Sequence, residues 1–216
     1  PEGRCRAGDG RAPDGGGAVS SPAGIAGGYT IAADVAIEIA VGGNGDDDIA
    51  GNALDNRLYG SAGSDTIAGL GGADSVRGNG GGDRIDGGTG DDTVAGGRGA
   101  DTVSGNAGDD RLGGNAGEDV LLGYAGDDAL RGGGGDDYVA GGYGADTLGG
   151  GPGEDRLAGA SGPDVAAGGP GRDVLLGGGG EDGLLGGRGR DLVAGEAGDD
   201  RLAGGPAADR LEGGAD

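Results

Sequence analysis

The sequence predicts an all-β fold in which one short unit is stacked on itself many times. Two observations carry this prediction. A nine-residue pattern repeats without insertion from residue 42 to residue 212, and each repeat places one aliphatic residue between neighbours that are often small or β-branched, as in a short strand. Glycine supplies 65 of the 216 residues, which favours tight turns between such strands.

The composition excludes several classes of function. The chain has no His, so His-dependent catalysis and His-ligated zinc are excluded. Its net charge is -23 and aromatic residues make up 2%, which argues against binding nucleic acid through phosphate contacts and base stacking. No apolar run is long enough to span a membrane.

Residues 1–28 are rich in Gly, Ala and Arg and show no periodicity, which is typical of a leader or linker. Cys5 is the only cysteine, so no internal disulfide can form. We expect an exposed thiol there, with a disulfide to a segment outside this sequence as the alternative.

In residues 29–41, mostly large aliphatic side chains alternate with small or polar ones. This pattern predicts a half-buried strand that caps the first repeat. The side chains expected to face inward are Ile31, Ala33, Val35, Ile37, Ile39 and Val41.

The repeats begin at Gly42 and form nineteen consecutive units that end at Glu212. Position one is always Gly, and position four is Gly except at Leu54 and Ala207. Position six is Asp except at Asn56, and position eight is Ile, Leu or Val except at Ala166. Residues 213–216 start a further unit. Four positions held in phase over this length exclude a disordered acidic tract.

The resulting pattern, G-G-x-G-x-D-x-U-x with U aliphatic, resembles the calcium-binding nonapeptide of the RTX (hemolysin-type) family. The resemblance implies a right-handed parallel β-roll of nine to ten coils. Each coil would contain two nonapeptides, and calcium ions would lie in the turns along both edges.

The segment from Tyr29 to Gly60 is also similar to the start of the RTX domain in serralysin-type secreted metalloproteases. The atypical second unit, with Leu54 and Asn56, fits that likeness. The zinc-binding His motif of those proteases is absent, so no protease activity follows from it.

Calcium also suits the residues themselves. It takes six to eight oxygen ligands, and a Gly-rich turn with one Asp offers carbonyl and carboxylate oxygens together, whereas soft ligands for zinc, copper or iron are missing. With two units per coil, the position-six residues fall into two columns, and neighbouring carboxylates in a column would repel each other without a cation. The first column is Asp47, Asp65, Asp83, Asp101, Asp119, Asp137, Asp155, Asp173, Asp191 and Asp209; the second is Asn56, Asp74, Asp92, Asp110, Asp128, Asp146, Asp164, Asp182 and Asp200.

These eighteen aspartates are the expected metal ligands. Further acids at position five strengthen the negative field without being direct ligands: Asp46, Asp91, Asp109, Asp127, Asp136, Asp199, Glu118, Glu154 and Glu181. One buried aliphatic side chain per nine ordered residues does not offset the loss of chain entropy, so we expect the chain to fold only when calcium binds.

Positions seven and nine should face outward. On one sheet they include an apolar set, which is interpreted either as scattered exposed residues or as a surface for self-association or docking: Val120, Leu122, Tyr138, Val174, Leu176 and Leu192. The other sheet is richer in Arg, with Arg57, Arg111 and Arg201, and is expected to be solvated.

The sequence therefore predicts a calcium-binding repeat module of a secreted protein, without enzymatic activity of its own, which folds outside the cell. The alternative is a calcium-dependent structural protein of a filament, surface layer or biofilm matrix. The resemblance implies export by type I secretion, although no secretion signal is visible after the repeats.

Overall fold

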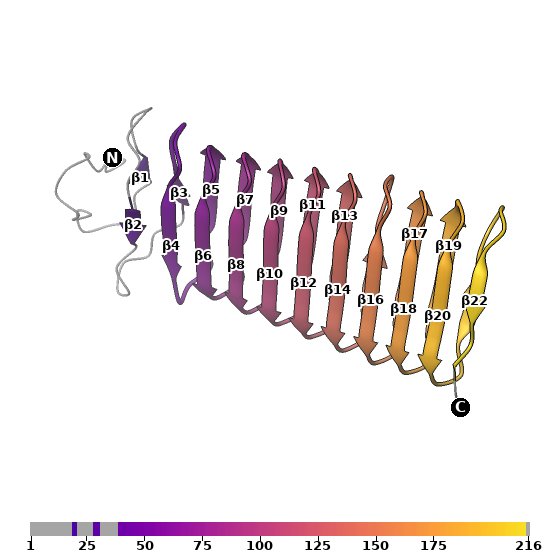
Figure 1. Ribbon diagram of the computed structural model, residues 1–216. Helices are drawn as coiled ribbons and strands as arrows, with labels where there is room; N and C mark the ends of the chain where they lie inside the picture. The colour runs from indigo at the N-terminus through magenta and orange to yellow at the C-terminus, as the bar shows by residue number, and fades with distance from the viewer. Residues whose placement is uncertain (1–18, 21–27, 31–38, 215–216) are drawn as a thin grey trace.

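The computed structural model describes residues 19–20, 28–30 and 39–214. The described residues form two parallel sheets of eleven strands each, and they contain no helix. Successive strands alternate between the sheets, so the chain winds through a β-solenoid of about ten coils, with consecutive coils side by side along its length (Figure 1). The predicted all-β roll is confirmed.

The odd-numbered strands form one sheet, called the odd sheet here, in the order β1 to β21. Their bounds are β1 Val19–Ser20, β3 Ile39–Val41, β5 Arg57–Ala62, β7 Ser75–Gly80, β9 Thr93–Arg98, β11 Arg111–Ala116, β13 Ala129–Gly134, β15 Thr147–Gly149, β17 Val165–Pro170, β19 Gly183–Arg188 and β21 Arg201–Ala203.

The even-numbered strands form the even sheet, in the order β2 to β22. Their bounds are β2 Gly28–Thr30, β4 Asp48–Asn52, β6 Thr66–Gly71, β8 Arg84–Thr89, β10 Thr102–Ala107, β12 Val120–Ala125, β14 Tyr138–Tyr143, β16 Arg156–Ser161, β18 Val174–Gly179, β20 Leu192–Ala197 and β22 Arg210–Glu212.

The register between neighbouring strands is 18 residues, or two repeats, from β3 onward. Ile49 pairs with Ile67 in the even sheet, and Leu58 pairs with Val76 in the odd sheet. Each position-eight residue therefore stacks on the position-eight residue of the next coil. These side chains form the hydrophobic core between the sheets, and those from Ile49 to Val193 are buried.

The core is open at the C-terminal end of the described chain. Leu202 is only partly buried against the core, and Leu211 is 49% exposed. Positions seven and nine flank the buried position eight and face outward, as expected, because side chains alternate along a strand.

The structure differs from the expectation for residues 29–41, most of which lie outside the described residues. The two described parts of that segment, β2 and β3, belong to different sheets. Ala40, expected to face outward, is buried at 2% exposure, whereas Ile39 and Val41 are only half-buried. Ala40 pairs with Leu58, so the two-repeat register decides which side chain enters the core.

Two glycine positions are required by close approach of the backbone. Gly63, at position four, has φ +124, and a Cβ there would lie 2.5 Å from the carbonyl oxygen of Gly45 in the preceding coil. Gly87, at position one, points into the roll, where a Cβ would lie 2.5 Å from Oδ2 of Asp92. The turns are therefore tight at position four, and space at position one is taken by a carboxylate.

Candidate metal centre

Each position-six aspartate ends a turn, one residue before a strand begins. Asp65, for example, immediately precedes β6, and Asp74 immediately precedes β7. The first column of aspartates lies along the edge where the chain passes from the odd to the even sheet, here called the first edge, and the second column lies along the opposite, second edge. The aspartates from Asp47 to Asp191 are at most 3% exposed, while Asp200 and Asp209 at the open end are half-buried.

From Asp65 in the first column and Asp74 in the second, one oxygen of each carboxylate is held by the backbone of the preceding coil. The amide of Asp47 donates to Oδ1 of Asp65 at 2.8 Å, and the amide of Asp92 donates to Oδ1 of Asp110 at 2.8 Å. The same bond recurs along both columns and ends with Asp182 to Asp200 and Asp191 to Asp209, each at 3.0 Å. It fixes the orientation of these carboxylates, whereas the carboxylate of Asp47 accepts from the amide of Gly43 in its own turn.

The other oxygen of these carboxylates is buried and has no hydrogen-bond partner. This holds for one carboxylate oxygen of every position-six aspartate from Asp47 to Asp200. A buried carboxylate oxygen without a partner is costly, and the cost is removed by a cation. The repetition of the same unsatisfied atom in every coil marks the two edges as candidate cation sites.

At many coils a carbonyl oxygen of the next coil lies near the unsatisfied carboxylate oxygen. A Cβ built on Gly186 would lie 2.6 Å from Oδ2 of Asp191 and 2.7 Å from the carbonyl oxygen of Gly204, one coil further on. The same three-residue arrangement occurs at Gly87, where a Cβ would lie 2.5 Å from Oδ2 of Asp92 and 3.1 Å from the carbonyl oxygen of Gly105. The cradle thus offers hard oxygen donors of two kinds, the donor set that calcium prefers.

Position one was not among the expected site residues. Its role in the cradle could have been inferred from the presence of Gly in all nineteen units. In the described part of the chain, no group of three or more acidic, His or Cys side chains is arranged to hold a metal ion. An ion at either edge therefore requires backbone carbonyls as well as the aspartates.

Burial raises the pKa of the position-six carboxyls from Asp65 to Asp182. The pKa rises to about 6 for Asp65 and Asp101 and to about 7 for Asp110. Loss of hydration is the main cause of the rise. The hydrogen bond donated by the backbone amide of the preceding coil lowers the pKa, and the charges of neighbouring carboxylates raise it. Without a cation, these groups therefore hold protons more tightly than ordinary aspartates do.

The position-five acids differ from the position-six acids in exposure and in bonding. Asp91 and Asp109 are exposed, and each accepts a hydrogen bond from a backbone amide of the next coil. The amide of Asp109 donates to Oδ1 of Asp91 at 3.0 Å, and the amide of Asp127 donates to Oδ1 of Asp109 at 2.9 Å. Asp46, Asp55 and Asp136 accept the same type of bond. These carboxylates are directed along the roll toward its C-terminal end.

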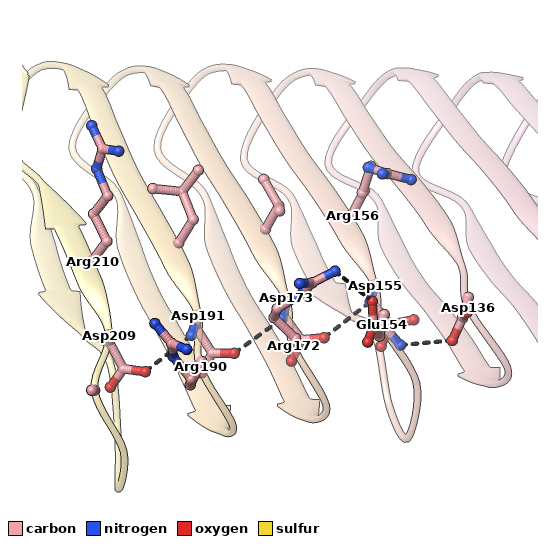
Figure 2. A pocket seen from close by; sticks show the side chains of 13 residues that line it. Asp136, Glu154, Asp155, Arg156, Arg172, Asp173, Arg190, Asp191, Asp209 and Arg210 are labelled. Atoms are coloured by element: carbon pink, nitrogen blue, oxygen red, sulfur yellow. Dashed lines mark hydrogen bonds and ion pairs between the residues drawn. The ribbon is translucent and has the colours of Figure 1, made fainter.

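Position five of the first edge changes from acidic to basic toward the C-terminal end. Asp136 and Glu154 are followed, 18 residues apart, by Arg172 and Arg190, which line an open groove of about 630 Å³ (Figure 2). Arg172 Nη2 lies 2.9 Å from Glu154 Oε2, and both side chains are exposed. The last coils of this edge therefore carry less negative charge at position five than the coils before them.

The comparisons with known proteins agree with this geometry. The model of the RTX calcium-binding nonapeptide repeat matches residues 41–76, 77–112, 113–148, 149–184, 158–193 and 185–216. A comparison with curated proteins found no match. The matches are to the repeat itself, so the likeness of the segment from Tyr29 to Gly60 to serralysin-type proteases stays a prediction. Since the matched residues make up most of the chain, the chain belongs to the family of RTX calcium-binding nonapeptide repeat proteins.

Proposed function

We propose that this chain is a non-catalytic module that folds outside the cell when several calcium ions bind along both edges of the roll. The ligands would be the unsatisfied oxygens of the position-six aspartates and backbone carbonyls such as those of the position-one glycines. The buried, partnerless oxygen in every position-six aspartate from Asp47 to Asp200 carries the proposal. Each ion would supply the positive charge that offsets carboxylate repulsion between successive coils.

The coupling between binding and folding rests on the small core. Each strand from β4 to β19 contributes a single buried aliphatic residue, β20 contributes Val193 and the small Ala194, and the second inward position is the position-one glycine. Hydrophobic burial is therefore low for the length of backbone that is ordered. Ions that bind the rolled chain but have no preformed site in the unfolded chain would shift the balance toward the fold.

The extracellular setting rests on calcium availability and on the family. Extracellular calcium modules bind at about 10⁻⁴–10⁻³ M, concentrations that are not reached in the cytosol. Membership of the RTX family implies a secreted protein. The chain would then stay unfolded during export by type I secretion and roll up afterwards, free or attached to the cell surface. In the described residues, no helix has the length and apolar character of a membrane span.

Circular dichroism during a calcium titration tests this proposal, with magnesium as the control and light scattering recorded on the same sample. We expect a cooperative change from coil to β-structure with calcium and little change with magnesium, because magnesium demands a stricter octahedral geometry and dehydrates reluctantly. A spectrum that stays disordered at millimolar calcium would contradict the proposal. So would full β-structure in the presence of a chelator at neutral pH.

A structural role in an extracellular assembly is the second candidate, because the even sheet presents apolar side chains outward. Tyr138 is 42% exposed, and Val120, Leu122, Val174, Leu176 and Leu192 are half-buried. If this face mediates self-association, the double variant Leu176→Asp, Leu192→Asp lowers the sedimentation coefficient without changing the calcium midpoint. Leu185→Asp on the odd sheet, where Leu185 is 48% exposed, is the control. An unchanged distribution of species would reject this role.

A further inference from the structure

The two outer faces of the roll differ in charge, although the chain as a whole is acidic. No strand of the odd sheet contains Asp or Glu, and seven arginines lie on these strands, all exposed: Arg57, Arg77, Arg98, Arg111, Arg131, Arg188 and Arg201. The even sheet carries Arg84, Arg156 and Arg210, and also Asp48, Asp86, Glu196 and Glu212. The roll therefore has one purely basic face and one mixed face.

Five of the seven arginines lie on consecutive strands, one on each of β5, β7, β9, β11 and β13, which are neighbours in the odd sheet (Figure 1). Neighbouring parallel strands are about 4.8 Å apart, so the row extends over about 19 Å. The register staggers the row across the strands: Arg77 pairs with Tyr59, Arg111 with Thr93, and Arg131 with Gly113. We call Arg57, Arg77, Arg98, Arg111 and Arg131 the arginine row.

Within the described residues, the ion pairs join Arg172 to Glu154 and Arg210 to Glu212, and no hydrogen bond or ion pair joins the five guanidinium groups of the row to an acid. The acids nearest in the chain are in the turns, such as Asp91 and Asp92 before β9, where Asp92 forms part of the candidate metal site and Asp91 accepts an amide of the next coil. Calcium bound in the turns would further reduce the negative field around the face. The guanidinium groups thus remain available for an external anion.

We propose that the arginine row binds a linear acidic polysaccharide whose carboxylates pair with the guanidinium groups. Arg binds carboxylates through two parallel hydrogen bonds, and staggered charges on five successive strands can pair with several carboxylates of one extended polymer. Between the arginines, the outward positions carry hydroxyl and amide groups that suit sugar hydroxyls, namely Ser61, Ser75, Asn79, Thr93 and Asn115.

The residues of this face disfavour single-stranded nucleic acid and an anionic lipid surface as its partner. Its only aromatic residue is the half-buried Tyr59, whereas single-stranded nucleic acid is usually held by stacking on several aromatic rings. From β5 to β13, it has no outward Leu, Ile, Phe or Trp that would insert into a lipid surface. Both remain alternatives for the experiment to reject.

The test compares two triple variants of the full chain at saturating calcium. Arg77→Gln, Arg111→Gln, Arg131→Gln removes three charges from the arginine row, and Arg84→Gln, Arg156→Gln, Arg210→Gln removes the same number from the even sheet. The probe is a fluorescent hyaluronan oligosaccharide, a linear polymer with one carboxylate per disaccharide, and binding is followed by polarisation at two salt concentrations. Circular dichroism first establishes that each variant rolls up with calcium, which keeps a failure of folding separate from a failure of binding.

We expect wild-type binding that weakens with salt, at least a tenfold loss of affinity in the arginine-row variant, and a change below twofold in the even-sheet variant. Absence of binding by the folded wild type would overturn the proposal. Equal losses in both variants would also overturn it, since they would indicate a nonspecific charge effect. Retained binding by the arginine-row variant would indicate that calcium, and not the arginines, bridges to the polysaccharide. Tighter binding of duplex DNA or phosphatidylserine vesicles would assign the face to another partner. Either result would reject the proposed binding of a polysaccharide by the arginine row.

Discussion

The backbone amide of Asp101 donates a hydrogen bond of 2.8 Å to Oδ1 of Asp119, the equivalent residue of the next coil. Oδ2 of Asp119 has no partner and is buried. One side chain thus joins two coils through its first oxygen and presents the second oxygen to the candidate metal site. This division of roles between the two oxygens allows them to be separated by mutation.

Asp119→Asn should weaken calcium binding while leaving the fold accessible. The amide oxygen of Asn can still accept the bond from Asp101, but the negative charge at the site is lost. We expect the midpoint of the calcium titration to rise by about tenfold, the equivalent of about 1.4 kcal/mol. The check is circular dichroism against calcium concentration.

Glu118→Gln is the matched control, because Glu118 is the neighbouring exposed acid at position five of the same turn. It removes the same charge and should shift the midpoint much less. Equal shifts in the two variants would mean that the overall field, and not ligation by Asp119, sets the affinity.

Gly87→Ala should disrupt the roll although it adds a single methyl group. The new Cβ would lie 2.5 Å from Oδ2 of Asp92 and 3.1 Å from the carbonyl oxygen of Gly105, so both oxygens of the cradle must move. Overpacking of this type costs about 1–3 kcal/mol. The expected result is a higher calcium midpoint and a lower thermal midpoint at fixed calcium.

Gly134→Ala provides the comparison for that substitution. A Cβ on Gly134 meets nothing within 4 Å, and its φ is not in the left-handed region. Replacing this glycine should be neutral or stabilising by up to about 1 kcal/mol, since Ala loses less entropy on folding. If Gly87→Ala were equally harmless, the geometry of the cradle described above would be wrong.

Much of this fold could be predicted because two repeats make one coil. Once the period was known, Leu58 and Val76 had to stack, and so did Asp101 and Asp119. Ala40 shows where the prediction was wrong. Local alternation favoured Ile39 and Val41 as core residues, but the register with Leu58 places Ala40 inside, so the coil period overrides the local pattern.

The cradle could be predicted only in part. The aspartates stood out as charged residues at a fixed position, and the structure places those from Asp47 to Asp191 in buried turns. The carbonyl of Gly204 beside Asp191 could not be identified from residue type, because every residue has a carbonyl and only the backbone path brings this one to the site. Calcium ligation by these groups stays a prediction.

Leu70→Asn should stabilise the calcium-bound roll. Leu70 occupies position two with φ 80 and is 54% exposed, and a left-handed conformation costs a residue such as Leu about 1–2 kcal/mol. Asn79, at the same position of the next unit, adopts φ 77, and Asn tolerates this conformation well. We expect a gain of about 1 kcal/mol in urea unfolding at saturating calcium.

Leu185→Asn separates the backbone effect from the removal of an exposed leucine. Leu185 is 48% exposed, similar to Leu70, but its φ is not in the left-handed region. This control should show no gain. A similar gain in both variants would attribute the effect to surface hydrophobicity rather than to the backbone.

Acid should partly replace calcium in the ion-free chain. Burial raises the pKa of Asp65 to about 6 and that of Asp110 to about 7, from an ordinary value of 3.8. A carboxyl whose pKa is higher in the folded state binds protons better when folded, so its contribution is fully present below about pH 4 and is lost as the pH rises through 6 to 7. In a chelator, β-structure should therefore increase as the pH is lowered from 8 to 5.

The calcium-loaded chain should show the opposite dependence, because protons compete with the ions for the same carboxylates. Its calcium midpoint should rise as the pH falls below about 6, and this opposite slope is the internal control. Circular dichroism gives both curves, and light scattering on the same samples separates folding from precipitation. The ion-free chain could gain no β-structure on acidification. In that case carboxylate repulsion and burial do not prevent the ion-free roll from forming, and the small core alone must account for its instability.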